Sequence, residues 1–229
     1  MLIKDLQEIQ KRQKQKVSDF YTTRGLHVYF KDKIENPNID FDKAIAEVES
    51  VIPTHLMSEV EMVMVGHFQE FDERGINAFY ADGMVCISND QDSEADIVDD
   101  IVHEVAHSVE EAQGYLIYGD NKVKNEFLDK RLLLHDILWS AGYRTPKKKF
   151  TEVEYDQDFD MFLLQTVGYN KLVQYCNGIF ISAYAPTSLR EYFATGFTDF
   201  LLRSDSHNYM KKTCPQLYQK IYNLYEESD

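Results

Sequence analysis

The sequence predicts an α+β fold, with a small mixed sheet in the first part of the chain and a mostly helical second half. Two patterns predict it. Up to residue 88, short apolar runs alternate with polar residues and end at turn residues, as strands do. After residue 92, apolar residues recur at the three- and four-residue spacing of helices. A chain of 229 residues can bury a core of its own, and we expect one continuous domain, 1–229.

In the first part, residue spacing and turn signals define each expected element. Apolar residues at near-helical spacing precede Gly25, and Asp82-Gly83 is a strong hairpin-turn signal. The expected elements are a helix over 1–22, a strand over 26–30, a helix over 40–51, a strand over 61–68 and a hairpin over 76–88.

In the second half, glycines mark the ends and breaks of helices. Gly114 and Gly142 are placed to stop two helices, and Gly168 is placed to break a third. The expected elements are helices over 93–112, 121–141, 158–175, 188–203 and 215–226, with a short strand over 178–182.

Composition excludes several classes of protein. The formal net charge of −15 argues against nonspecific binding to nucleic acid. No stretch approaches the roughly 20 apolar residues of a membrane helix, and the N-terminal sequence MLIKDLQEIQKRQKQK has no apolar core of a secretory signal. Cys86, Cys176 and Cys214 are far apart, which is typical of reduced thiols. We therefore expect a cytoplasmic protein with no nucleic-acid or membrane partner.

One helix carries a motif with chemical meaning. The stretch DIVHEVAHSV over 100–109 holds His103 and His107, with Glu104 directly after the first histidine. On a helix, the aliphatic residues span an arc of about 140° and the two histidines fall on nearly the opposite side. They therefore lie either on a solvent-exposed face or on the floor of a cleft. Two imidazoles one turn apart can bind one zinc ion, and Glu104, offset by about 100°, suits a base acting on water at that metal.

A catalytic zinc site needs a third protein ligand. No histidine follows His107 at short spacing, and His135 lies on a leucine-rich helix, where a structural role is expected. Glu191, in TSLREYFATGFTDFL, is the better candidate. The run from Ser188 to Glu191 also fits a capping box, in which the glutamate binds back to the start of its own helix. Spacing alone leaves both roles of Glu191 open.

Two segments resemble a known family. VHEVAHSVEEAQGYL over 102–116 and REYFATGF over 190–197 are similar to the catalytic domain of the anthrax lethal factor-like zinc metallopeptidases, a gluzincin group related to the Pro-Pro endopeptidases. The resemblance covers about residues 76–226 and is sharp in those two helices and the turn before the second. It implies a zincin-like fold in which an edge strand lies above the HExxH helix. Residues 61–229 would then be the catalytic domain, and residues 1–60 an N-terminal helix with the start of the α/β part.

The resemblance also implies a zinc endopeptidase with particular site residues. It implies His103, His107 and Glu191 as the zinc ligands and Glu104 as the general base. The family places a tyrosine seven residues before the third ligand, and that position is Tyr184 here. Its hydroxyl would stabilise the oxyanion of the tetrahedral intermediate.

The chain departs from the family in two places. One turn after the third ligand the family often carries a second acid, and here that position is Thr195. Because such carboxylates orient ligating histidines, the affinity or geometry of the site would differ. The segment over 119–182 is also longer than in the family, which suggests an inserted element that shapes or covers the cleft.

The expected substrate is a protein or peptide bound as an added strand. The acidic chain favours a basic target sequence, although the acid-rich run SNDQDSEAD over 88–96 can instead complement the dipole of the following helix. The second strand of the hairpin is taken as the edge strand, and the residues expected to bind the substrate backbone are Gly83, Met84, Val85, Cys86, Ile87 and Ser88.

Two other functions fit the same residues. One is a non-enzymatic assembly or interaction protein that keeps the zincin scaffold, and the general character of the sequence points to a bacteriophage origin and to a virion component. The other is a zinc hydrolase acting on a non-peptide amide. The joint retention of ligands, base and tyrosine favours the peptidase, because a scaffold needs only packing.

Overall fold

The computed structural model describes residues 19–226. The helix expected over 1–22 lies outside the described residues as far as residue 18, and its last part is a strand, so the expectation is wrong there. This strand, β1 (Asp19–Tyr21), pairs antiparallel with β2 (His27–Phe30). Phe20 lies opposite Val28 and stacks on Phe30. Phe20 fits a helical spacing in the sequence, but it lies in a strand because β2 is available to pair with this segment.

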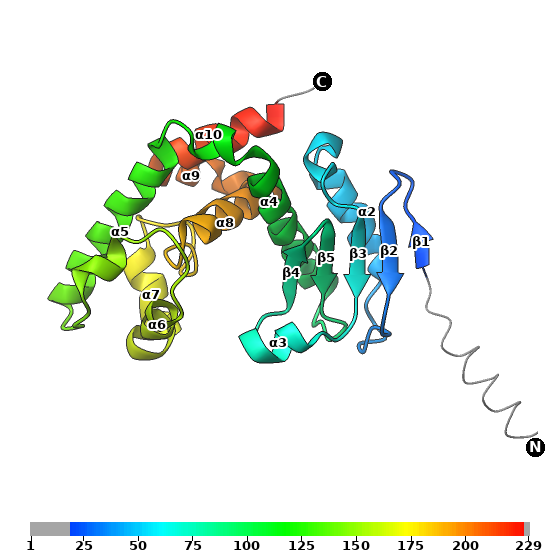
Figure 1. The fold of residues 1–229 in the computed structure, drawn as a ribbon, viewed down its shortest axis with the longest axis horizontal. Helices are drawn as coiled ribbons and strands as arrows, with labels where there is room; N and C mark the ends of the chain where they lie inside the picture. The colour runs from blue at the N-terminus through cyan, green and yellow to red at the C-terminus, as the bar shows by residue number, and fades with distance from the viewer. Residues whose placement is uncertain (1–18, 227–229) are drawn as a thin grey trace, which may run out of the picture.

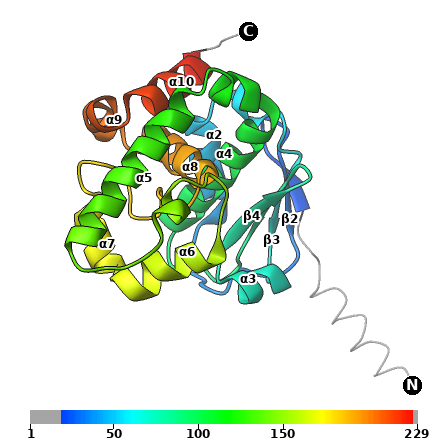
Figure 2. The ribbon, with the colours of Figure 1, turned by 60° about the vertical axis from the view of Figure 1, so that its left-hand side comes forward.

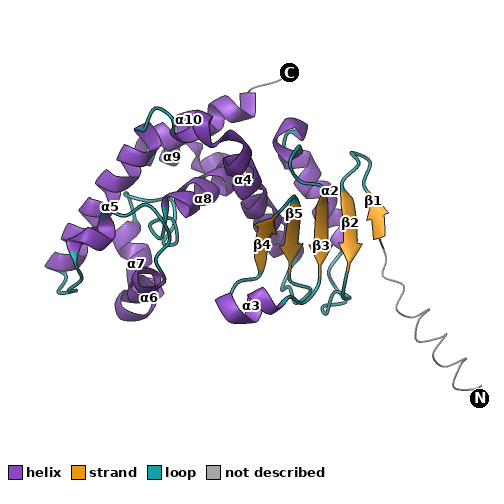
Figure 3. Ribbon diagram, in the orientation of Figure 1, coloured by secondary structure: helices purple, strands orange, loops and turns teal. Residues whose placement is uncertain are grey.

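The five strands form one mixed sheet in the order β1-β2-β3-β5-β4. The strands β2, β3 (Met62–Val65) and β5 (Met84–Ile87) run parallel, and β4 (Ala78–Ala81) is antiparallel to β5. The expected hairpin is confirmed: Asp82 and Gly83, at its turn, have φ angles of 49° and 80°, the positive values that a tight two-residue turn requires. The strand order places β5 inside the sheet and β4 at its edge (Figures 1 and 3).

Two helices, α2 (Phe41–Val51) and α4 (Glu94–Tyr118), cover one face of the sheet (Figure 1). The core between these helices and the sheet includes aliphatic strand residues that are fully buried: Val28, Val63, Val65, Val85 and Ile87. The expected helix over 40–51 is confirmed as α2, which begins where the Asp40 carboxylate accepts the N–H of Lys43. The sheet therefore provides a rigid apolar base on which α4 rests.

The helices that follow α4 in the chain lie on the other side of α4 from the sheet (Figures 1 and 2). The expected helices over 121–141, 188–203 and 215–226 are confirmed, as is the break at Gly168, which has a φ of 88°. The helices of this half are α5 (Lys122–Ser140), α6 (Gln157–Met161), the π-helical segment η3 (Phe162–Gly168), α7 (Tyr169–Cys176), α8 (Leu189–Leu202), α9 (His207–Thr213) and α10 (Pro215–Glu226). Shorter elements not expected from the sequence, besides α9, are η1 (Thr54–Met57), α3 (Gln69–Arg74), η2 (Lys147–Phe150) and η4 (Ser204–Ser206).

The helix that carries the histidines is longer than expected. The predicted stop at Gly114 is wrong: the backbone leaves helical geometry at Gln113 (φ −116°, ψ 18°), and the helix then continues to Tyr118. Ile117 is buried, and the Tyr118 ring packs edge-on against Phe193 of α8. These contacts outweigh the low helix propensity of glycine, which is about 1 kcal/mol below that of alanine.

The strand expected over 178–182 is also wrong, because this segment forms turns. Ile179 and Phe180 are buried among the helices. The Lys130 ammonium donates to the carbonyl of Ile179 at 2.8 Å, and the Tyr209 hydroxyl donates to that of Phe180 at 3.3 Å. Side chains thus satisfy the backbone acceptors that a strand would offer to a neighbouring strand.

Strands from both sides of residue 60 share the sheet, since β2 pairs with β3. Cys86, Cys176 and Cys214 are free and buried. Of the helices in residues 19–226, none has the length and apolar character needed to cross a membrane.

Candidate metal centre

The position of α4 on the sheet orients its two histidines. Ser93 caps the start of the helix, because its hydroxyl accepts the N–H of Asp96. The sheet side of the helix buries Ser108, whose hydroxyl donates to a carbonyl of the same helix, and a stripe of aliphatic residues: Ile97, Val98, Ile101, Val102, Val105 and Val109. Burial of this stripe fixes the rotation of the helix, so His103 and His107 point away from the sheet and toward α8. The sequence leaves open whether the two histidines lie on a solvent-exposed face or on the floor of a cleft. In the structure they lie at the interface between α4 and α8.

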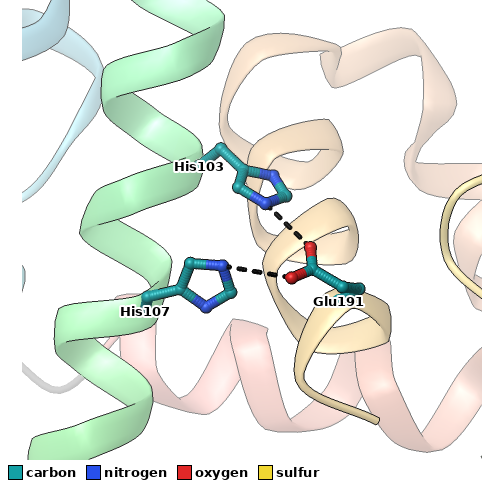
Figure 4. Close-up of side chains that lie close together, drawn as sticks. All are labelled: His103, His107 and Glu191. Carbon is teal, nitrogen blue, oxygen red and sulfur yellow. Dashed lines mark hydrogen bonds and ion pairs between the residues drawn. The ribbon is translucent and has the colours of Figure 1, made fainter. Parts of the chain in front are cut away.

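Three side chains meet between α4 and α8: His103, His107 and Glu191. One donor atom from each lies within 4.8 Å of the others. His103 Nε2 lies 3.0 Å from one carboxylate oxygen of Glu191, and His107 Nε2 lies 3.6 Å from the other (Figure 4). Within residues 19–226, no other group of three histidine, cysteine or acidic side chains meets in this way. The structure therefore brings the three predicted ligands together, although Glu191 lies 88 positions after His103 in the chain.

The two roles left open for Glu191 are now distinguishable. The hydroxyl of Ser188 caps α8 by accepting the N–H of Glu191 at 3.1 Å, which is one half of a capping box. The carboxylate of Glu191 does not complete the box, because its two oxygens face His103 and His107. The backbone of Glu191 thus belongs to the cap and its side chain to the site.

His103 and Glu191 shift each other's pKa, and each shift favours the charged form. Burial lowers the pKa of His103, but the hydrogen bond and negative charge of Glu191 outweigh it, so the pKa lies above its ordinary value. Burial raises the pKa of Glu191, but the hydrogen bond from His103 and the charges of His107, His103 and Arg190 prevail and lower it. The carboxylate is therefore ionised at neutral pH, as a metal ligand has to be.

Glu104 lies beside this group and is 7% exposed. Burial raises its pKa, and the charge of Glu191 acts in the same direction. His107, His103 and the backbone N–H of Tyr80 oppose this rise only in part. A carboxylate with a raised pKa accepts a proton more readily than one in water, which is what a general base requires.

Tyr184 lies in the turn that leads into α8. Its N–H donates to the hydroxyl of Ser182 at 3.2 Å, and the hydroxyl of Thr187 donates to its carbonyl at 2.9 Å. Its side chain is 37% exposed, and the burial of the remainder, followed by the charges of Glu191 and Asp160, raises the pKa of the phenol. The phenol therefore stays protonated at neutral pH within the field of the ligand carboxylate and is able to donate a hydrogen bond.

The strand expected to bind the substrate is not the edge strand. Gly83, Met84, Val85, Cys86, Ile87 and Ser88 span β5, which hydrogen-bonds to β3 on one side and to β4 on the other. Both rows of its backbone groups are used, so the expectation of an edge strand at Gly83–Ser88 is wrong. The edge strand on this side of the sheet is β4, and the backbone of Tyr80 in β4 faces the carboxylate of Glu104. A hairpin signal in the sequence cannot show which of its strands pairs with β3.

The donor set fits a divalent transition metal. Two imidazole nitrogens and one carboxylate oxygen converge, and this combination is one that catalytic zinc sites use while leaving a coordination position open. His135 of α5 is not part of the group: its ring packs between Trp139 of the same helix and Phe150 of η2, the structural role expected for it.

Sequence reasoning missed a set of residues on the far side of His107. Glu110 and Arg190 both approach its Nδ1 atom, and Tyr118 bonds to Glu110. One signal was available, since Glu110 follows His107 by three positions and thus shares its side of the helix. The position of Arg190 depends on how α8 packs against α4.

Comparisons of this chain with protein-family models, curated proteins and solved structures gave no match. The resemblance to the lethal factor-like peptidases therefore rests on the motif residues, and the grouping of His103, His107 and Glu191 is consistent with it.

Proposed function

We propose that this protein is a zinc-dependent endopeptidase of the gluzincin type, with His103, His107 and Glu191 as zinc ligands and Glu104 as the general base. The observation that carries the proposal is the convergence of the three donor atoms within 4.8 Å beside a second, buried carboxylate, that of Glu104. A structural scaffold has no need for Glu104, because burying a carboxylate costs free energy that packing alone would avoid.

A peptide substrate is favoured over other amides by the open edge of the sheet. β4 has no partner strand on its outer side among residues 19–226, and its Tyr80 faces Glu104. An extended peptide can pair with such an edge through main-chain hydrogen bonds alone. We further propose that the preferred peptides are basic, because the chain has a net charge of −15.

In this mechanism Glu104, Tyr184 and the backbone of β4 each have a separate role. Bound zinc would supply a Lewis acid that lowers the pKa of water and polarises a carbonyl. Glu104 accepts the proton of the attacking water and later delivers it to the leaving amine. Tyr184 donates its hydroxyl hydrogen bond to the substrate carbonyl oxygen as negative charge develops there. The backbone of β4 holds the peptide extended next to these groups.

The test combines zinc content with peptide cleavage. Wild type, Glu191→Ala, Glu104→Gln and the control Glu47→Gln, an exposed acid on α2, are loaded with zinc, dialysed and measured by elemental analysis. Each is then incubated with a peptide library rich in lysine and arginine. We expect about one zinc per chain in wild type, Glu104→Gln and Glu47→Gln, and loss of zinc in Glu191→Ala. Cleavage should fall about 10³-fold in Glu104→Gln while its zinc is retained.

Each alternative has a distinct outcome. Wild type that takes up no zinc contradicts the metal site and leaves the scaffold function. Zinc uptake without cleavage of any peptide contradicts the peptidase and directs the search to non-peptide amides.

A further inference from the structure

Glu110, Arg190 and Tyr118 surround the ring nitrogen of His107 that does not face Glu191, and of these three Arg190 is partly exposed, at 52%. Glu110 Oε2 lies 3.7 Å from His107 Nδ1, and the two side chains are only 13% and 9% exposed. Arg190 reaches the same place from α8, with its Nε 3.1 Å from His107 Nδ1 and 3.1 Å from Glu110 Oε2. The Tyr118 hydroxyl donates to the other oxygen, Glu110 Oε1, at 2.5 Å. Glu110 is thus held from two sides against the imidazole.

His107 Nδ1 and Glu110 Oε1 each receive a hydrogen bond, whereas Glu110 Oε2 receives none from residues 19–226. The Nε of Arg190 carries a single N–H, which is directed at His107 Nδ1. Glu110 Oε2 is buried and receives no hydrogen bond from any of residues 19–226, although the guanidinium lies at ion-pair distance. Buried carboxylate oxygens without a donor are rare, because desolvation is then uncompensated. This oxygen is therefore placed for a donor besides Arg190.

The chemistry of a ligating histidine identifies that donor. A neutral imidazole that binds a metal offers one bare nitrogen and carries its proton on the other. Nε2 of His107 is the nitrogen near Glu191, so Nδ1 has to carry the proton. Arg190 has donors only and cannot accept it. Glu110 Oε2 is the adjacent acceptor, and the N–H of Arg190 can turn to the same oxygen, which has two lone pairs.

We propose that Glu110 is the positioning residue of the metal centre: its Oε2 accepts the Nδ1–H of His107 and so holds Nε2 toward the metal. This inference rests on the proposed function, because it needs His107 as a ligand. α8 has Thr195 one turn after Glu191 and offers no carboxylate there. The acid that orients a ligand therefore comes from the ligand helix itself, with Arg190 and Tyr118 holding it in place.

The test is the zinc affinity of variants, measured by competition with a chromogenic chelator. Glu110→Gln removes the charge, and Glu110→Asp keeps it but withdraws the oxygen by one methylene. Glu111→Gln, an exposed acid one residue further on, is the matched control. We expect Glu110→Gln to weaken zinc binding by about 10- to 100-fold, Glu110→Asp to lie between it and wild type, and Glu111→Gln to match wild type. The visible spectrum of the cobalt-loaded protein should change in Glu110→Gln and not in Glu111→Gln.

Thermal unfolding of the chelator-treated variants separates positioning from a merely structural role. A Glu110→Gln protein that unfolds at a lower temperature but keeps wild-type zinc affinity and cobalt spectrum overturns the inference. If Glu110→Gln does not fold, Glu110→Asp decides: weakened binding supports the proposal and unchanged binding overturns it. Wild type that binds no zinc overturns the proposed function and this inference with it, whereas normal wild type with normal variants overturns the inference alone.

Discussion

The two faces of α4 are both buried, yet they are made of opposite kinds of side chain. The face on the sheet is mainly aliphatic, with Ile97, Ile101 and Val105 0% exposed, and the buried Ser108 hydroxyl on this face donates to a carbonyl of the same helix. The face toward α8 carries Asp100, His103, Glu104, His107 and Glu110 on one side of the helix. Two of these, Glu104 and His107, are each only 7% exposed.

The difference between the faces indicates what each one does. Burying aliphatic carbon stabilises the fold by about 25 cal/mol per Å² and requires no partners. Burying charged groups is unfavourable unless each finds a counter-charge or hydrogen bond. The polar face has such partners, since α8 supplies Glu191 and Arg190. We infer that the aliphatic face stabilises the fold and that the polar face serves the chemistry.

The largest expected effect is on the aliphatic face. Ile101→Ala should lower the free energy of unfolding by about 3 kcal/mol, because it leaves a cavity between α4 and the sheet. Zinc affinity of the folded variant should stay within about twofold of wild type, since Ile101 points away from the ligands. Urea unfolding and chelator competition measure the two quantities. Leu116→Ala, at an exposed position of the same helix, is the control. A parallel loss of zinc affinity in Ile101→Ala would show that the two faces are coupled.

The next effect concerns Tyr184, which lies in the turn that leads into α8 and not on the polar face of α4. Tyr184→Phe should reduce kcat/KM for peptide cleavage by about 10²-fold, because one hydrogen-bond donor to the developing oxyanion is lost. Stability and zinc content should not change, since the Tyr184 side chain is 37% exposed and its proposed contribution is made only in the transition state. Steady-state kinetics with Tyr169→Phe, another exposed tyrosine, as control provides the measurement. Equal activity of Tyr184→Phe and wild type would remove Tyr184 from the mechanism.

The smallest effect is a pH dependence of stability at the start of the polar face. Burial raises the pKa of Asp100 from 3.8 to about 6, against the hydrogen bond donated by Gln91. The folded chain therefore binds this proton more tightly than the unfolded chain, and the resulting stability is lost as the pH rises from about 4 through about 6. Asp100→Asn, which keeps an acceptor for Gln91, should be more stable than wild type at pH 7.5 by on the order of 1 kcal/mol after allowance for solvent screening. Thermal unfolding should show no difference below about pH 4, and an equal difference at both pH values would contradict this cause.

Local patterns were enough to predict the α+β order, the hairpin and the ligand helix. The Asp82-Gly83 turn and the aliphatic stripe of α4 act over a few residues, so their effect can be read from the sequence alone. The same stripe determined that the two histidines lie opposite the core. The local patterns failed where tertiary contacts outweighed them: Gly114 does not end α4, and residues 178–182 do not form a strand.

The sequence by itself determined which residue types could form the site, because helical spacing puts His103, Glu104 and His107 on adjacent positions of one helix. Only the tertiary structure decided that Glu191 meets them, that β4 and not β5 is the edge of the sheet, and that Arg190 and Glu110 share the far nitrogen of His107. The physical reason is the distance along the chain over which each interaction acts. Caps, turns and helical faces depend on neighbours within about one turn, whereas the packing of α8 on α4 and the pairing of β5 with β3 join residues far apart in the chain.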